Sequence, residues 1–515
     1  MKFELTQEQK DIVNTVYDTD KIIKIQAFAG ASKTTSLVEV VKEIRKTDKK
    51  SKILYLVFNK SMVEDSKNKF EELGLNVECY TTHSFCLRRF NMLRDDDMEV
   101  MSSINYADYM KVKNTNSKYK FCKFKNIIDM FNSYCLCFDS LEDFCKNVKI
   151  NPKNYDLTMN RLTSSEIDFF KDLYQYFIKK GKYLHNMYVK EYVCNTADKV
   201  RGYKYILLDE AQDTNLMALR MLKRFVYDKM WVVGDIHQQL YRFNRAVNAM
   251  DKFEGTEYPL TTSFRFNNEV CDLANKILRL KPSFKGTIKN FHNNTKVKNK
   301  KEKAILFRTN ANMFMYAVEL IKNTENTKVK FMDVKNGNQA DNFECVFSDM
   351  IYFFSKLLEN RGKDEYLDLY KSTFKIIRSK QIDDYVKIAE KEGYNNLYRF
   401  LYQNKQILSV DFARYFTFFL QNELEIVDIL SKVRNSEDCE NPDKTYTLLT
   451  VHRAKGLEFE NVKIAPDKWR IDSDDEINIL YVAVTRAKHK LDHSAIDPLI
   501  ETKEESETED ELTKL

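Results

Sequence analysis

Short apolar runs recur along the chain, and each is followed by a polar turn or by residues with a helical spacing of apolar positions. Such runs are typical of strands buried on both faces of a parallel sheet, because helices then cover both faces. The pattern therefore predicts an α/β fold, with strands at Ile22–Ala27, Ile53–Phe58, Tyr205–Leu208, Met230–Val233, Ala304–Phe307 and Tyr446–Val451.

Two long stretches, residues 87–184 and 345–434, interrupt this alternation with mostly helical patterns. Examples in the second stretch are Asp349–Leu358 and Asp411–Leu420. We therefore expect two α/β domains, each with a mostly helical insertion. On this division the first domain comprises 1–86 and 185–265 with insertion 87–184, the second comprises 266–344 and 435–500 with insertion 345–434, and 501–515 is an acidic tail that we expect to be disordered.

Charge is distributed unevenly along the chain, whose formal net charge is +6. Residues 501–515 contain seven acidic residues and two lysines, whereas Lys285–Lys303 contains seven lysines and one glutamate. Clustered lysines suit a polyanionic partner, because they release counterions from its phosphates. A solvated lysine-rich loop explains the cluster equally well, so charge alone leaves nucleic acid binding open.

No run of about 18 apolar residues is present, and the first ten residues lack the apolar core of a signal peptide. We therefore expect an intracellular protein, cytoplasmic or nuclear, with reduced cysteines. Cys122, Cys135, Cys137 and Cys145 lie in one segment but lack paired C-x₂-C spacing and a nearby histidine. They are predicted to be core thiols rather than metal ligands.

The first apolar run leads into a phosphate-binding pattern. A strand, a tight loop of small residues and a Lys-Thr pair that opens a helix are the parts of a P-loop, in which backbone N–H groups hold phosphates. Lys33 would reach the β and γ oxygens of ATP, and Thr34 would hold Mg²⁺. Ala27 and Ser32 stand where the strict pattern has glycine, so we expect a strained loop or a weakened affinity for nucleotide. The predicted ATP-binding residues of this segment are Ala29, Gly30, Ala31, Ser32, Lys33, Thr34 and Thr35.

The run Tyr205–Leu208 delivers Asp209 and Glu210 at its carboxyl end, which is a Walker B arrangement. Asp209 would hold Mg²⁺, and Glu210 would orient and deprotonate the attacking water. A strand that ends in a solvated acidic turn is the simpler alternative. The presence of Lys33 and Thr34 in the same chain favours the phosphate site.

Segments in the same order along the chain resemble the motifs of the UvrD/Rep family of superfamily 1 helicases. The helicase part of the eukaryotic F-box DNA helicases resembles this chain most, although we expect no F-box segment before it. The matching segments are Leu5–Gln9 (Q motif), Phe58–Ser61 (Ia), Thr81–Ser84, Asp209–Asp213 (II), Gly234–Tyr241 (III), Thr262–Phe266 (IV), Thr450–Phe459 (V) and Tyr481–Lys488 (VI).

This resemblance implies two RecA-like motor domains with ATP between them and adds residues to the expected ATP site. Gln9 would read the adenine edge, although Thr6 and Gln9 also fit a helix capping box. Glu458 would contact the nucleotide. Arg265 and Arg486, from the second half of the chain, would stabilise charge on the transferred phosphoryl group. The expected catalytic residues are Lys33, Glu210, Gln238, Arg265 and Arg486.

The resemblance also implies 3′-to-5′ translocation on single-stranded DNA, unwinding at junctions of single- and double-stranded DNA, and a need for ATP and Mg²⁺. Aromatic stacking tolerates any base sequence, as a translocating motor requires. An RNA helicase, a DNA-binding remodeller with weak ATPase activity, and a scaffold that uses the acidic tail are the alternatives. The expected DNA-binding residues are Phe58, Asn59, Thr82, His83, Tyr241, Phe243 and His452.

Overall fold

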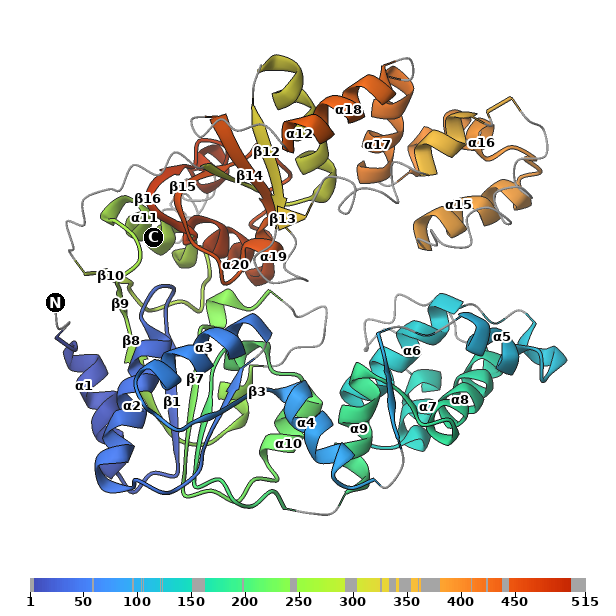
Figure 1. Ribbon diagram of the computed structural model, residues 1–515. Coiled ribbons are helices and arrows are strands. Elements are labelled where there is room, and N and C mark those ends of the chain that lie inside the picture. The colour runs from blue at the N-terminus through green and yellow to red at the C-terminus, as the bar shows by residue number, and fades with distance from the viewer. Residues whose placement is uncertain are drawn as a thin grey trace, which may run out of the picture. The chain divides into compact units, whose positions relative to one another are not determined.

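The computed structural model divides the chain into two compact units, which are described separately. Unit 1 is Met1–Arg265 with Thr287–Phe291, and unit 2 is Phe266–Gly286 with His292–Leu515 (Figure 1). The structure describes residues 4–57, 60–94, 97–102, 104, 106–120, 122, 124–150, 163–196, 199–240, 248–291, 303–324, 327–332, 340–341, 353–359, 361–362, 380–408, 410–422, 425–437 and 444–501.

Unit 1 is built on a six-stranded sheet in the order β3-β2-β6-β7-β1-β8, in which all paired strands are parallel. Strands β2 and β7 are buried along their whole length, as the apolar runs predict. Because the strands are parallel, their carboxyl ends meet at one edge of the sheet. The strands are β1 (Ile22–Ala27), β2 (Ile53–Val57), β3 (Glu78–Thr81), β6 (Tyr205–Leu208), β7 (Lys229–Gly234) and β8 (Thr256–Leu260).

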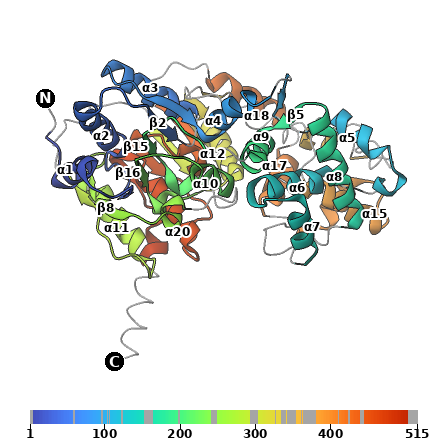
Figure 2. The ribbon, with the colours of Figure 1, turned by 90° about the horizontal axis from the view of Figure 1, so that it is seen from below.

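Alternate side chains of these strands enter two different cores. Tyr55 and Trp231 pack with α1 (Gln7–Asn14), α2 (Lys33–Thr47) and α3 (Lys60–Glu72), which lie together in Figures 1 and 2. Leu54 and Leu56 point to the other face. There they pack with the helices α4 (Thr82–Asn91), α9 (His185–Asn195) and α10 (Leu216–Leu222). The period of two along each strand therefore produces a helix–sheet–helix sandwich.

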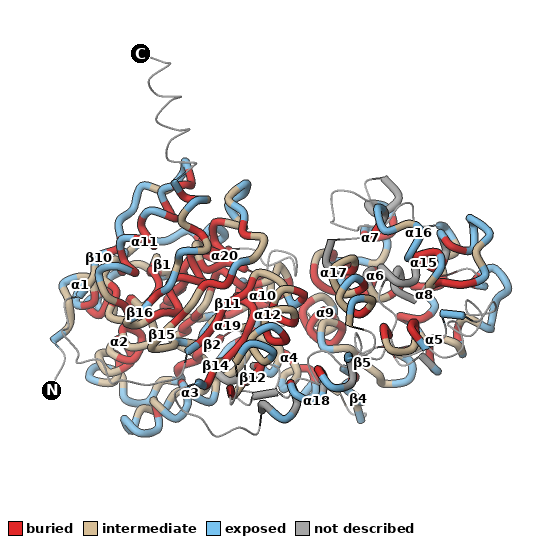
Figure 3. Tube along the Cα trace, turned by 90° about the horizontal axis from the view of Figure 1, so that it is seen from above, coloured by how far each residue is buried: buried red, intermediate tan, exposed pale blue. Residues whose placement is uncertain are grey.

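The described residues between 87 and 184 are mostly helical, as predicted, and share the second of these cores. Figure 3 shows buried segments continuing through this region. Its helices are α5 (Tyr106–Lys113), α6 (Phe124–Cys137), α7 (Leu141–Ile150) and α8 (Ser164–Lys179), beside a two-stranded ladder of β4 (Glu99–Met101) and β5 (Lys182–Leu184).

The cysteines of this region are core thiols. Cys122, Cys135 and Cys145 are buried in the cluster, whereas Cys137 is partly buried. Burial raises the pKa of the Cys122 thiol to about 11, so the thiol stays protonated near neutral pH. The interpretation as core thiols is confirmed for the three buried residues.

Unit 2 contains a second six-stranded sheet in the order β13-β12-β14-β11-β15-β16, parallel except for β13. Each of the six apolar runs predicted to be strands forms a strand in one of the two sheets, although Phe58 lies outside the described residues and Val451 begins a helix. The unit 2 strands are β11 (Lys303–Phe307), β12 (Lys328–Met332), β13 (Ala340–Asp341), β14 (Thr445–Thr450), β15 (Phe459–Ile464) and β16 (Ala487–Asp492).

Helices of unit 2 pack against this sheet and against each other. Residues 353–359 are helical, whereas 349–352 of the predicted helix Asp349–Leu358 lie outside the described residues. The predicted helix Asp411–Leu420 is α17 (Val410–Gln421). The others are α11 (Asn268–Arg279), α12 (Asn310–Asn323), α15 (Lys380–Lys391), α16 (Leu397–Gln403), α18 (Ile426–Glu437), α19 (Val451–Ala454) and α20 (Asp474–Val484).

One segment was assigned to the wrong unit. Residues 287–291, placed by the sequence in the second domain, belong to unit 1 because β10 (Lys289–Asn290) pairs with β9 (Thr262–Ser263). The Phe291 N–H donates to the Ser263 carbonyl at 2.9 Å, and the rings of Phe291 and Phe264 lie 4.9 Å apart. Two-residue pairings of this kind leave no periodic signal in a sequence.

Among the described residues, no helix is both long and apolar enough to cross a membrane.

A buried hydrogen bond between Thr15, directly after α1, and the sheet yields a stability prediction. The Trp231 indole N–H donates to Thr15 Oγ1 at 2.8 Å, and both residues are fully buried. The Thr15→Val variant keeps the side-chain shape but leaves the indole N–H without its acceptor. We expect a decrease of about 1–3 kcal/mol in the free energy of unfolding of unit 1, measured by urea denaturation. The same substitution in a Trp231→Phe background should cost clearly less; equal costs in both backgrounds would contradict this account.

Candidate nucleotide and DNA sites

The loop between β1 and α2 has two residues with positive φ. Gly30 has φ +74°, and a Cβ at this position would lie 2.4 Å from Ser263 Oγ and 2.5 Å from Arg265 Cβ, so only glycine fits. Ser32 has φ 59° and ψ 39°, in the left-handed region, directly before α2 begins at Lys33. The strained loop expected from Ser32 is therefore present, because a Cβ in this conformation costs about 1–2 kcal/mol.

Neighbouring segments hold this loop in place. The Phe28 N–H donates to the Leu260 carbonyl at 3.1 Å, which ties the start of the loop to β8. The Phe264 N–H donates to the Gly30 carbonyl at 2.9 Å. The loop is thus fixed by the sheet and by the segment after β9, which is how a backbone cradle for phosphates is kept open.

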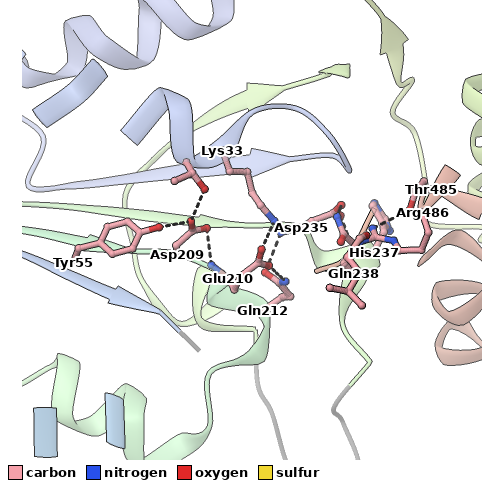
Figure 4. Close-up of polar contacts among 12 residues, drawn as sticks. Lys33, Tyr55, Asp209, Glu210, Gln212, Asp235, His237, Gln238, Thr485 and Arg486 are labelled. Carbon is pink, nitrogen blue, oxygen red and sulfur yellow. Dashed lines mark hydrogen bonds and ion pairs between the residues drawn. The ribbon is translucent and has the colours of Figure 1, made fainter. Parts of the chain in front are cut away.

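Lys33 and Glu210 form an ion pair at the carboxyl edge of the sheet (Figure 4). Lys33 Nζ lies 3.0 Å from Glu210 Oε1, and their side chains are 12% and 16% exposed. Burial disfavours the Lys33 ammonium, but the carboxylates of Glu210, Asp209 and Asp235 outweigh it and raise the pKa of Lys33. Glu210 itself has φ 51°, a second left-handed residue at the site. The three carboxylates therefore keep the Lys33 ammonium charged.

Asp209 is buried, and donors fix both of its carboxylate oxygens. Oδ2 accepts the Tyr55 hydroxyl at 2.7 Å and the Thr34 hydroxyl at 3.4 Å, and Oδ1 accepts the Glu210 N–H at 2.8 Å. Burial, followed by repulsion from Glu210, raises the pKa of Asp209, so the site favours a further cation. The oxygens of Thr34 and Asp209 are the donors that Mg²⁺ prefers beside phosphate oxygens, so these residues fit the ion.

A second polar cluster follows β7. The Gln238 amide donates to Asp235 Oδ2 at 2.6 Å, and the Asp235 N–H donates to Gln212 Oε1 at 3.0 Å. The Gln212 amide in turn donates to Glu210. Gln238, an expected catalytic residue, is therefore connected to Glu210 through the buried residues Asp235 and Gln212 (Figure 4).

Gln9 occupies the N-terminus of α1. Its Oε1 accepts the Thr6 N–H at 3.0 Å, and Thr6 Oγ1 accepts the Gln9 N–H at 3.3 Å, which confirms the predicted capping box. Gln9 Nε2 lies 3.4 Å from Ser36 Oγ on α2. The capping box thus places the Gln9 amide against the helix that follows the phosphate loop.

Comparison with known proteins identifies the family. The family model for the UvrD/REP helicase N-terminal domain matches residues 5–257, and the model for the UvrD-like helicase C-terminal domain matches residues 446–491. The chain belongs to the UvrD/Rep-type helicases. Its α/β architecture of parallel sheets flanked by helices agrees with this assignment.

Several curated proteins are similar over most of the chain. F-box DNA helicase 1 of Gallus gallus is 26% identical over 94% of this chain and 48% of its own length. F-box DNA helicase protein 1 of Schizosaccharomyces pombe is 25% identical over 95% of the chain and 57% of its own length. A probable DNA helicase II homolog of Mycoplasma pneumoniae is 24% identical over 91% of the chain and 81% of its own length. The chain therefore spans about half the length of the F-box relatives.

The two arginines of the UvrD/Rep-type pattern lie in different units. Arg265 belongs to unit 1, where the predicted bounds 185–265 also place it, and it lies beside Gly30. Arg486 belongs to unit 2 and is buried, with hydrogen bonds to the Val482 and Leu457 carbonyls at 2.9 and 3.1 Å. Glu458, also in unit 2, pairs with Lys488 at 3.2 Å. Only Arg265 is brought to the phosphate loop within one unit.

Of the expected DNA-binding residues, Phe58, Asn59, Tyr241 and Phe243 lie outside the described residues. Thr82 begins α4, and the His83 Nε2 atom lies 3.0 Å from Asn186 Oδ1 of α9. Burial lowers the pKa of His83, so its ring is neutral at neutral pH and serves to join two helices.

The remaining expected DNA-binding residue, His452, is half-buried in α19 of unit 2. Its pKa is lowered by burial and then by Arg308. A DNA role for Thr82, His83 and His452 stays a prediction.

Three residues of the site were not assigned a role from the sequence. Asp235 and Gln212 lie inside recognised motifs, so their polar character was an available signal. Nothing in the sequence pointed to a role for Tyr55 at this site, because a tyrosine in an apolar run is normally predicted to be a core residue. Its hydroxyl acquires a role only through the sheet, which places β2 beside β6.

The strained Ser32 yields a second prediction. We expect Ser32→Gly to stabilise unit 1 by about 1 kcal/mol, because glycine adopts positive φ without a Cβ penalty. The Ser32 side chain makes no capping hydrogen bond to α2, so no cap is lost. Thermal melting measures the effect. Ser32→Ala keeps the Cβ and should give no gain; equal stabilisation by both variants would show that backbone strain is not the cause.

Proposed function

We propose that this chain is an ATP-dependent DNA helicase or translocase that hydrolyses ATP at the carboxyl edge of the first sheet. The observation that carries the proposal is the convergence of Lys33, Asp209 and Glu210 beside the glycine-containing loop. This supplies phosphate binding, a cation-holding carboxylate and a base within one unit. The membership in the UvrD/Rep-type family supports DNA as the polymer.

The ion pair of Lys33 with Glu210 suggests how nucleotide binding prepares the base. The β and γ phosphates of ATP are stronger partners for an ammonium than one carboxylate is, so Lys33 would transfer to them. Glu210 then loses its cation and becomes free to accept a proton from the attacking water. Mg²⁺, when bound, supplies positive charge beside the phosphate oxygens.

Gln238 and the arginines extend this scheme. Gln238 is hydrogen-bonded to Asp235, whose backbone is tied to Gln212 and through it to Glu210. A change at the γ phosphate would therefore be transmitted from Glu210 to the segment after β7, where Tyr241 and Phe243 are the proposed stacking residues. Arg265 and Arg486 are proposed to stabilise the transferred phosphoryl group, with Arg265 already beside the loop.

On this proposal each cycle of ATP binding and hydrolysis moves the two motor domains and advances the protein along single-stranded DNA. We infer 3′-to-5′ movement from the family resemblance, with unwinding where single- and double-stranded DNA meet. Stacking and phosphate contacts do not distinguish DNA from RNA by themselves.

The ATPase proposal predicts the behaviour of two variants. Lys33→Ala and Glu210→Gln should each lower DNA-stimulated ATP turnover by about 10²–10⁴-fold, because they remove the phosphate-binding cation and the base. Glu210→Gln should still bind ATP. The measurement is steady-state phosphate release with and without single-stranded DNA.

A second ion pair of the same unit provides the control for this experiment. Lys24 and Glu257 lie 3.2 Å apart between β1 and β8. Lys24→Ala and Glu257→Gln should leave turnover within about twofold of the unsubstituted chain, because Glu257 is exposed and an ion pair open to solvent contributes little. Unchanged turnover in Lys33→Ala or Glu210→Gln would eliminate the ATPase, and turnover that DNA does not change would eliminate the motor.

The direction of movement gives a fourth prediction. Duplexes with a 3′ single-stranded tail should be unwound, whereas duplexes with only a 5′ tail should not, when strand separation is followed with ATP and Mg²⁺. RNA in place of single-stranded DNA should stimulate ATP turnover poorly. Preference for the 5′ tail would reverse the proposed polarity, and stronger stimulation by RNA would favour an RNA helicase.

A further inference from the structure

Tyr55 is a fully buried residue with a polar hydroxyl in the middle of the otherwise apolar strand β2. A buried phenol needs a hydrogen-bond partner, and Tyr55 donates to Asp209 Oδ2 at 2.7 Å (Figure 4). This is the shortest of the hydrogen bonds that hold the Asp209 carboxylate, since the Thr34 and Glu210 donors lie at 3.4 and 2.8 Å. Tyr55 therefore fixes the oxygen that faces Thr34.

The other side of the Tyr55 hydroxyl faces α3. The side chain of Ser66, buried within α3, interacts with Tyr55. The Phe70 ring, one helical turn from Ser66, meets the Tyr55 ring edge-on at 5.4 Å and holds it in place.

Helix α3 has a second contact with the nucleotide site. Lys69 Nζ donates to Thr35 Oγ1 at 3.3 Å, in the first turn of the helix that follows the phosphate loop. Ser66, Lys69 and Phe70 share one face of α3, because residues three and four apart are neighbours on a helix. This face is therefore in contact with both the Asp209 side and the phosphate-loop side of the site.

We propose that Ser66 and Tyr55 are positioning residues that orient Asp209, so that α3 controls the geometry of the proposed Mg²⁺ site. The inference rests on the proposed function, since it assigns Asp209 the role of holding the ion. Helix α3 begins at Lys60, directly after the proposed DNA contacts Phe58 and Asn59. A shift of α3 on binding a strand would reach Asp209 through two side chains.

Asp209 keeps its orientation because hydrogen bonds restrain both oxygens of its carboxylate. Removing the Tyr55 hydroxyl leaves Oδ2 with only the longer Thr34 bond, and the carboxylate gains freedom to rotate. Outer hydrogen bonds to ligating carboxylates typically contribute 10–100-fold in metal affinity. Ser66 interacts with Tyr55, so it would act on the carboxylate through Tyr55.

The test is Mn²⁺ binding to the full chain in the presence of ADP, measured by electron paramagnetic resonance, which requires no turnover. Tyr55→Phe keeps the ring and its contact with Phe70, and should raise the half-saturating Mn²⁺ concentration about tenfold. Ser66→Ala should raise it by a smaller factor. The double variant should match Tyr55→Phe alone, because Ser66 would act on Asp209 through Tyr55.

Tyr203→Phe is the matched control. The Tyr203 hydroxyl donates to Glu78 in a hydrogen bond of the same length, 2.7 Å, but this bond does not involve Asp209. This variant should bind Mn²⁺ like the unsubstituted chain, and melting temperatures show that all variants are folded. Wild-type-like Mn²⁺ binding by Tyr55→Phe would overturn the positioning role of Tyr55 and Ser66 alone. An equal effect of Ser66→Ala in the unsubstituted chain and in the Tyr55→Phe background would do the same. Absence of Mn²⁺·ADP binding by the unsubstituted chain would overturn the proposed function as well.

Discussion

The concentration of negative charge at one edge of the first sheet is the constraint on which the rest of the site depends. Asp209, Glu210 and Asp235 come from the carboxyl ends of β6 and β7, and Lys33 lies among them. Burial raises the pKa values of Asp209 and Asp235, so each carboxylate is costly to ionise without a cation nearby. The ammonium of Lys33 offsets part of this cost, and an added divalent cation would offset more.

Backbone strain accompanies this charge. Ser32 and Glu210 both adopt left-handed conformations, one directly before the lysine of the ion pair and the other at its glutamate. Such residues persist only where the surroundings hold them, and here the sheet does so through β1 and β6. The strain places the Glu210 side chain toward Lys33, whereas Asp209, one residue earlier, points to Tyr55 and Thr34. Adjacent acidic residues thereby receive different partners and different proposed roles.

The two arginines are restrained in different ways. The backbone of Arg265 lies against Gly30, so the position of this arginine depends on the loop itself. The guanidinium of Arg486 is buried among carbonyls of unit 2, and the Phe459 N–H donates to the Arg486 carbonyl at 2.9 Å. Arg486 therefore joins two motif segments of unit 2, and removing it affects the packing of that unit as well as any role in ATP hydrolysis.

Sequence alone determined the six predicted strands, the position of the acidic pair after β6 and the capping box of Gln9, because each depends on residues close together in the chain. Half-buried strands such as β15 and β16 lack a continuous apolar run and were found only in the structure. Tertiary structure also decided that Arg265 lies beside Gly30 and that Tyr55 bonds to Asp209. These contacts join residues far apart in the chain, and strand order, which no local pattern encodes, brings them together.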